Sequence, residues 1–428
     1  MFSLKNESKN IKTLFFAVLT IFFILCIWSI FYYGDSTFLG SFEKYNNDDV
    51  KYIRSAKVLL NEGMFTYKKP DVSTVFIMPG LPFTIAFFIA IFGNVAGIVA
   101  FRIFQAILQT LCLALAFFIG RKIFNSKVGI VSMILTLFYL VDIWASNMFL
   151  TETIFKFLFL TMFYFILFAL EEKKTKYYIV AGICFALSLL YRPPVALLPL
   201  VIIIMWIKYK YTFKECLKYT GIVALITVLV MSPWWIRNYN RFNMFIPFTL
   251  SSGNPMWLGS YIDNNRGGDP LKGTKYDTFR IENIEKETKP GMNKEIIANL
   301  KEVDRAKNRI SAHFEQRPLK TLRWYLIGKP AHLFKYPFYW FKVARPYVYV
   351  YHAVLIALSA IGFIIYLRNR SLNATFMMLT ILYFVITAIP FVNFSRYYYH
   401  LMTFNIILAS LTICKTIDFI KLKRLRNR

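Results

Sequence analysis

The stretch LFFAVLTIFFILCIWSIFYY, residues 14–33, is an apolar run about as long as a membrane-crossing helix requires. Lysines precede it and no small-residue cleavage site follows it, so we expect a retained helix and not a signal peptide. The rest of the chain has the same character, since 57% of the 428 residues are hydrophobic, 18% are aromatic and the mean hydropathy is +0.48. This composition exceeds the needs of a soluble core and predicts a polytopic membrane protein.

The basic residues are spread along the chain in short loops between apolar runs. A formal charge of +28 could indicate a nucleic-acid partner, but no single soluble face collects that charge, so we expect none. Lysine and arginine favour cytoplasmic loops, and the pattern is therefore topological. The expected cytoplasmic segments contain Lys5, Lys9 and Lys12; Arg121, Lys122 and Lys127; Lys173, Lys174 and Lys176; Lys208, Lys210, Lys214 and Lys218; Arg368 and Arg370; and the tail KLKRLRNR, residues 421–428.

The alternation of apolar runs and loops predicts an all-α transmembrane bundle of about nine to thirteen helices. Residues 81–119 are long enough for two helices, whereas the charge pattern demands an odd number of crossings there. Either 81–93 is a short re-entrant or tilted piece, or the charge pattern misleads. The other expected spans lie near 14–33, 128–141, 150–170, 178–191, 194–207, 219–236, 350–367, 374–391 and 398–414.

Three regions follow from this pattern. We expect an N-terminal catalytic transmembrane module over 1–236 with an outer loop at 34–78, an extracytoplasmic insert over 237–330, and C-terminal helices with a basic tail over 331–428. Within the insert, apolar residues recur at three-and-four spacing from Ile296 to Phe314. This spacing predicts an amphipathic helix packed on the outer face of the membrane domain.

The outer loop contains YNNDDVKYIRSAKVLLNEG, residues 45–63. Asn46 or Asn47 can cap a helix there, the acids Asp48 and Asp49 then occupy its first turn, and Gly63 ends it. An apolar face of Val50, Ile53, Ala56 and Leu60 is expected on this helix. Two acids at a helix N-terminus could simply complement the helix dipole, or they could serve a reaction.

The loop and its surroundings resemble the type C (GT-C fold) membrane glycosyltransferases, in particular the glycosyltransferase family 39-like branch with protein O-mannosyltransferases and lipid A aminoarabinose transferases. The residues that carry the resemblance are Asp48, Asp49, Tyr52, Ala56, Gly63, Pro79, Gly80 and Pro82. Further similar patches follow in order and contain Arg102 and Gln105, Glu152, Arg192, Arg237 and Asn238, and Arg396 and Tyr397.

This resemblance implies a sugar donor carried on a polyprenyl phosphate and an inverting transfer. It implies that Asp48 is the general base for the acceptor hydroxyl and that Asp49 supports it by orienting neighbours or holding a cation. A leaving lipid phosphate needs cationic partners, and arginine matches phosphate oxygens. The expected donor-phosphate residues are Arg192, Arg237, Arg396, Lys69 and Tyr397. The expected supporting residues are Tyr52, Arg102 and Glu152.

Each of these residues also has a simpler interpretation. Arginines at helix ends extend to lipid headgroups, and loop lysines are usually solvated. Some relatives bind a divalent cation through a glutamate at the second span, but FIMPG at 76–80 lacks one, so no cofactor is certain and a divalent cation is only possible.

Two functions remain open. One is a glycosyltransferase at the outer face of the cytoplasmic membrane, with a lipid, an envelope polysaccharide or a protein as acceptor. The other is a transporter or flippase that binds lipid-linked sugars without chemistry. Transporters often contain repeated halves, and the absence of such a repeat from the sequence favours the enzyme.

Overall fold

The computed structural model describes residues 2–288, 292–368 and 370–426, and helices connected by loops make up most of it. Within these ranges the only β pairing is an isolated bridge between Thr66 and Ser73. Six helices are long and apolar enough to cross a membrane: α1 (Lys9–Tyr33), α4 (Asn94–Ile123), α7 (Glu152–Glu172), α10 (Phe213–Phe242), α16 (Arg345–Arg368) and α18 (Met402–Arg426). Five shorter apolar helices are α3 (Gly80–Phe92), α5 (Ser126–Leu137), α8 (Thr175–Leu189), α9 (Pro199–Lys208) and α17 (Leu372–Ala388). The described helices confirm the predicted all-α membrane bundle.

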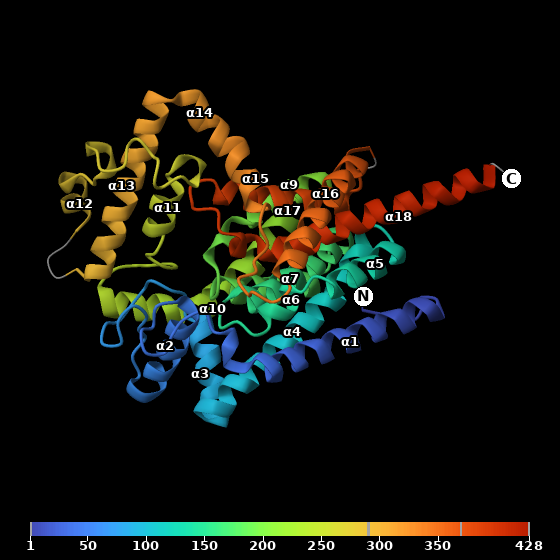
Figure 1. Cartoon of the computed structure of the whole chain (residues 1–428), viewed down its shortest axis with the longest axis horizontal. Helices are drawn as coiled ribbons and strands as arrows, with labels where there is room; N and C mark the ends of the chain where they lie inside the picture. Colours follow the sequence, from blue (N-terminus) through green and yellow to red (C-terminus); the bar gives the residue numbers. More distant parts are fainter. Residues whose placement is uncertain (1, 289–291, 369, 427–428) are drawn as a thin grey trace.

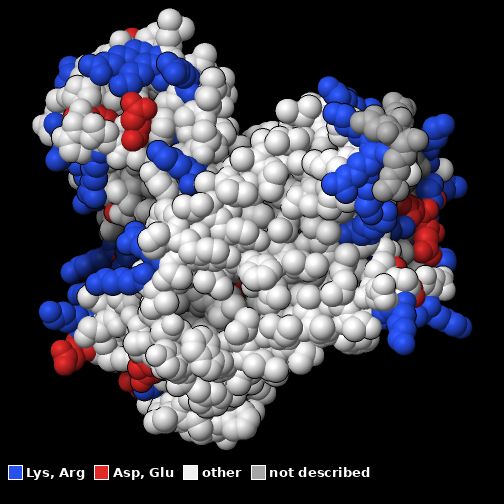
Figure 2. All heavy atoms as spheres, turned by 45° about the vertical axis from the view of Figure 1, so that its right-hand side comes forward, with Lys and Arg blue, Asp and Glu red and all other residues white. Residues whose placement is uncertain are grey.

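The bundle is elongated, with different elements at its two ends. Figure 1 shows the N-terminal end of α1 and the C-terminal end of α18 on one side of the molecule. Helix α2 (Asp48–Glu62), α3 and the insert helices lie on the other side (Figure 1). Figure 2 shows a broad band of uncharged surface between two groups of charged side chains. An uncharged band between charged ends is the surface expected of a multi-pass membrane protein. The last two residues of the basic tail, 427 and 428, lie outside the described residues.

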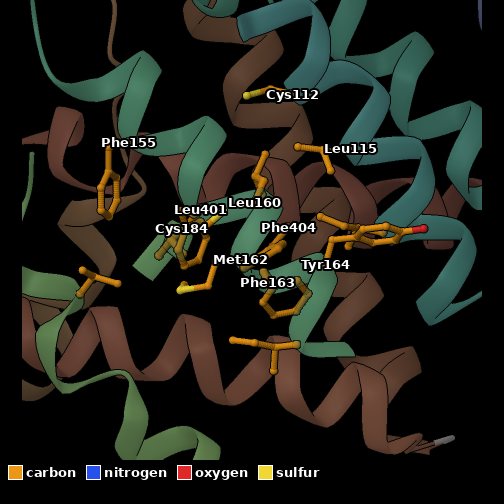
Figure 3. Close-up of a cluster of buried hydrophobic side chains, with 14 of the residues drawn as sticks. Cys112, Leu115, Phe155, Leu160, Met162, Phe163, Tyr164, Cys184, Leu401 and Phe404 are labelled. Atoms are coloured by element: carbon orange, nitrogen blue, oxygen red, sulfur yellow. The ribbon is translucent and has the colours of Figure 1, made fainter. Parts of the chain in front are cut away.

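The core forms where the apolar helices meet. Phe163 of α7 stacks on Phe376 of α17 with 4.5 Å between ring centroids, and Phe404 of α18 lies 4.6 Å from the same ring. Figure 3 shows Leu160, Met162 and Phe163 gathered with Phe404 in this cluster. Burying aromatic area in this way ties the C-terminal helices to the N-terminal ones, so residues 331–428 belong to the same bundle.

The ambiguous segment 81–119 contains one short and one long helix. The thirteen residues of α3 extend about 20 Å, which is less than the roughly 30 Å of a bilayer core, whereas the thirty residues of α4 exceed it. The two helices meet at Gly93. The short piece predicted as one alternative for residues 81–93 is therefore present.

The insert has helices of its own, namely α11 (Gly253–Gly259), α12 (Ile281–Glu287), α13 (Lys294–Gln316) and α14 (Pro318–Arg323). The predicted amphipathic helix is confirmed as α13, but the prediction that it packs on the membrane domain is only partly correct. It packs mainly on α11, and the carboxylate of Glu295 in its first turn accepts a hydrogen bond of 2.7 Å from Thr74 of the outer loop. The expected boundary at 236/237 falls inside α10, which continues to Phe242.

Candidate active site

Helix α2 presents the acid pair as the sequence predicted. Asn47 precedes it, and its side-chain oxygen accepts the Asp48 N–H at 2.6 Å. Gly63 ends the helix in the left-handed conformation at φ 66°, which glycine adopts without a Cβ penalty. The apolar face is buried except for Leu60, which is 41% exposed because it lies in the last turn.

The two acids face different surroundings. Asp49 is 1% exposed, and its Oδ2 accepts the backbone N–H of Leu39 at 2.6 Å and, more weakly, that of Gly40 at 3.4 Å. Asp48 keeps 32% of its side chain exposed. One Asp48 oxygen accepts the Tyr67 hydroxyl at 2.6 Å. The structure therefore places Asp49 against the loop backbone and leaves Asp48 as the accessible carboxylate.

Asp48 belongs to a cluster of opposite charges drawn from four parts of the chain. Arg396 of η6 (Ser395–Leu401) holds Asp48 Oδ2 at 2.8 Å through Nη2, and its Nε lies 3.9 Å from Glu152 Oε1. Glu152, the first residue of α7, also pairs with Arg192 at 3.2 Å. Arg192 donates to the backbone carbonyl of Arg396 at 3.4 Å. We call Asp48, Glu152, Arg192 and Arg396 the Asp48 cluster.

The cluster determines the ionisation of Asp48. Burial by itself would raise the pKa of this carboxyl, but the Arg396 guanidinium and the Tyr67 hydrogen bond outweigh it and lower the pKa below the ordinary value. Burial, together with the nearby Asp48 charge, raises the pKa of the Tyr52 and Tyr67 hydroxyls. Asp48 is therefore a carboxylate at neutral pH, and the two tyrosines stay protonated hydrogen-bond donors.

Two further predicted residues lie beside the cluster. The Arg192 guanidinium lies 5.3 Å from the ring centroid of Tyr397, and that of Arg396 lies 5.4 Å from the same ring. Tyr52 packs against Tyr67 with 5.3 Å between ring centroids. Cation–π contacts of this kind favour a guanidinium over an aromatic face.

Three predicted residues, Arg102, Lys69 and Arg237, lie away from Asp48. Arg102 is buried against Phe38 and donates to Asp35 at 3.3 Å, so it holds the start of the outer loop. Lys69 is exposed, and it makes no hydrogen bond or ion pair with any residue in the described ranges. The structure does not bring Lys69 to the cluster.

Arg237 faces a separate groove. It lines a cavity of about 920 Å³ between α2, α3 and α10, with walls that include Phe65, Phe83 and Trp234. Its Nη1 donates to the Thr74 carbonyl at 2.8 Å, and no carboxylate among the described residues pairs with it. A guanidinium with a free charge at the rim of an apolar groove fits an anionic headgroup with a long apolar tail.

Sequence reasoning missed Tyr67, and it missed a buried ion pair between Lys156 and Asp142 at 2.8 Å. No local signal marks Tyr67, which is one of 27 tyrosines. A lysine inside the apolar run of α7 was the available signal for the buried pair, because charges within such runs are costly and need partners. No group of three His, Cys, Asp or Glu residues in the described part of the chain could hold a metal ion, and the possible divalent cation stays a prediction.

The chain is similar to known proteins in both sequence and structure. Residues 69–236 match the family model described as dolichyl-phosphate-mannose-protein mannosyltransferase. The structure resembles the apo oligosaccharyltransferase of Archaeoglobus fulgidus at a TM-score of 0.58 and 14% identity, over 96% of this chain and 52% of that one. The fold is of the GT-C type.

Two further structures are similar. One is the same archaeon's oligosaccharyltransferase AglB in complex with an inhibitory peptide and a dolichol-phosphate, at a TM-score of 0.54 and 15% identity, over 98% of this chain and 52% of that one. The other is ArnT of Cupriavidus metallidurans bound to undecaprenyl phosphate, at a TM-score of 0.45 and 13% identity, over 94% of this chain and 76% of that one. The chain spans about half the length of the archaeal enzymes. No curated protein sequence matches it significantly.

The family match and the fold similarity cover different parts of the site. The matched segment 69–236 contains Glu152 and Arg192 but neither Asp48 nor Arg396. The GT-C fold comparison extends over nearly the whole chain. The Asp48 cluster therefore combines residues inside and outside the segment that matches the mannosyltransferase family.

Proposed function

We propose that this protein is an integral membrane glycosyltransferase that moves a sugar from a polyprenyl-phosphate donor to an acceptor hydroxyl, with inversion. The observation that carries the proposal is the Asp48 carboxylate, which is ionised, partly exposed and held by Arg396 at 2.8 Å beside a second guanidinium. A positioned base next to cations suits a reaction that removes a proton on one side and creates phosphate charge on the other.

Each charged side chain then has one role in the transfer. The acceptor oxygen forms a bond to the anomeric carbon while the bond from that carbon to the phosphate oxygen breaks. The acceptor proton goes to Asp48, and the electron pair leaves with the lipid phosphate. Arg396, which pairs with Asp48, and Arg192, which shares Glu152 with it, then stabilise that leaving charge, whereas Glu152 keeps the two guanidiniums in place.

The donor's lipid part fits the groove that Arg237 lines. Its apolar walls suit an isoprenoid chain, and a related GT-C fold structure contains a dolichol-phosphate. We assign Arg237 to an anionic part of the donor and Tyr397 to support of the arginines. Asp49 then acts indirectly, because its carboxylate holds the backbone of the loop that carries Asp48.

The reaction is proposed to occur at the extracytoplasmic face of the cytoplasmic membrane. Glu152 begins α7, and the twenty-one residues of this helix extend about 31 Å to its end beside Lys173. Helix α8 likewise begins after Lys174 and ends near Arg192. The Asp48 cluster thus lies at the ends opposite the basic loops, and basic loops favour the cytoplasm.

The acceptor is a lipid, an envelope polysaccharide or a protein, and membrane lipids surround the enzyme. The experiment uses the purified full chain in nanodiscs with a panel of radiolabelled polyprenyl-phosphate sugars and total envelope acceptors. Asp48→Asn should reduce transfer at least about 100-fold while donor binding persists. Glu43→Gln, which changes an exposed acid of the same loop, is the control.

Two outcomes would contradict the proposal. Transfer that survives Asp48→Asn would remove Asp48 as the base. A wild-type protein that binds donor and never transfers its sugar, but moves it across the bilayer, would favour the transporter.

A further inference from the structure

A second group of charges lies buried one helical turn from the Asp48 cluster. Lys156 Nζ holds both carboxylate oxygens of Asp142 at 2.8 Å. The Tyr399 hydroxyl donates to Asp142 Oδ1 at 2.5 Å and accepts from Gln109 Nε2 at 2.7 Å. The side chains of Lys156 and Asp142 are only 2% and 3% exposed.

This arrangement is costly for packing alone. Removing a lysine and an aspartate from water carries a desolvation penalty of several kcal/mol per ion, and apolar residues of similar volume often replace such a pair without loss of stability. The neighbouring helices are rich in apolar side chains that could fill the space. A buried charge pair in such a place therefore indicates that its directional contacts are needed to fix the positions of the elements that it joins.

This buried group joins two of the elements that supply the Asp48 cluster, α7 and η6. Lys156 follows Glu152 by one turn of α7, a rise of about 6 Å. Tyr399 follows Arg396 within the single short helix η6. Asp142, on α6 (Val141–Ala145), bonds to both Lys156 and Tyr399, and Lys156 Nζ also donates to the Tyr399 hydroxyl at 3.4 Å.

A fourth element completes the arrangement. Gln109 of α4 donates to the Tyr399 hydroxyl and, at 3.2 Å, to Thr153 Oγ1 of α7. Tyr399 is thus held by residues from α4, α6 and α7, and α7 is itself held by α4 and α6. A tyrosine with this many directional contacts has one allowed position, and that position limits where the rest of η6 can lie.

We propose that Asp142, Lys156, Tyr399 and Gln109 are positioning residues that hold η6 against α7 and thereby place the Arg396 guanidinium between Asp48 and Glu152. The proposal rests on the function proposed above. None of the four touches the Asp48 carboxylate in the structure, so they act through Arg396. A displacement of about 1 Å at a reacting centre can reduce a rate about 100-fold, so a displaced η6 should slow transfer.

The test removes one hydroxyl. Tyr399→Phe deletes the bonds to Asp142, Gln109 and Lys156 while keeping the ring. Tyr366→Phe is the matched control, because Tyr366 is also buried and its hydroxyl bonds to Thr375 in the first turn of α17. We expect Tyr399→Phe to remain folded with a lowered melting temperature, keep its donor KM and lose kcat about 10- to 100-fold. The control should keep both constants.

Two further readouts separate positioning from a merely structural role. Asp48 is faced by Arg396, Tyr67, Lys51 and Tyr52, and only the Arg396 contact should change, so the acid limb of kcat/KM should move to higher pH. Tyr399→Phe combined with Arg396→Lys should be no slower than Arg396→Lys alone, since both act on one contact. Independent, multiplying losses would overturn the proposal.

A structure of the Tyr399→Phe variant distinguishes this proposal from the proposed function. If wild type transfers no sugar, the proposed function fails, and the position of Arg396 still tests the positioning role. We expect the Arg396 guanidinium to leave hydrogen-bond distance of Asp48. Finding it in its wild-type place would overturn the positioning role.

Discussion

Arg396 Nη2 lies 2.8 Å from Asp48 Oδ2, which joins a residue near the start of the chain to one near its end. This contact defines the candidate active site, because it lowers the pKa of Asp48 and also brings the guanidinium to Glu152. A base that is paired with a cation is weak, so catalysis must come from placement and from the charges around the leaving phosphate.

Replacing Arg396 with Gln should move the acid limb of kcat/KM to higher pH. The guanidinium favours the ionised form of Asp48 and lowers its pKa, so its removal raises that pKa. A base must be ionised, and activity is then lost at a higher pH than in wild type. The measurement is a pH–rate profile, with Arg345→Gln, an exposed arginine, as control. An unmoved acid limb in Arg396→Gln would mean that Asp48 is not the titrating base.

Tyr67→Phe should lower kcat about 10-fold and also reduce the stability of the protein. The lost hydrogen bond of 2.6 Å ends on a charged group, and such bonds contribute about 1.5 to 3 kcal/mol. Single-turnover transfer measures the effect. Tyr45→Phe serves as control, since its hydroxyl makes no hydrogen bond to the described residues. Equal rates for Tyr67→Phe and wild type would show that this hydroxyl does not orient Asp48.

Arg237→Gln should raise the apparent KM for the donor about 10-fold and change kcat little. The residue lines the apolar groove and lies apart from the Asp48 cluster, so its loss removes binding that substrate and transition state share. Initial rates over a range of donor concentrations measure it, and Arg280→Gln on the exposed insert is the control. A fall in kcat with constant KM would instead place the reacting phosphate at Arg237.

Gly80→Ala should destabilise the protein, by about 1 to 3 kcal/mol, and slow transfer. A Cβ at Gly80 would lie 2.6 Å from the Leu190 carbonyl, where the backbone of α3 donates a hydrogen bond to the end of α8, just before Arg192. Gly221→Ala in α10 is the matched control, because its Cβ meets no atom within 4 Å. Thermal melting in nanodiscs gives the comparison, and equal melting temperatures for the two variants would contradict the close contact.

Much of the fold could be read from local patterns. The apolar runs, the cap at Asn47, the stop at Gly63 and the periodicity of α13 each depend on neighbours within a few residues, and each was predicted. The packing partner of each helix was harder to predict from the sequence. The face of α13 was expected on the membrane domain and lies mainly on α11, because periodicity identifies an apolar face without identifying what covers it.

The sequence by itself determined that this is a helical membrane protein with an acid pair opening a helix after its first apolar run, because hydropathy and capping act locally. Only the tertiary structure decided which charges meet. It left Asp48 and not Asp49 as the accessible acid, paired Arg396 with Asp48 and Arg192 with Glu152, left Lys69 in the loop and placed Arg237 at a separate groove. The physical reason is that each of these contacts joins elements far apart in the chain, so their meeting depends on how the whole bundle packs.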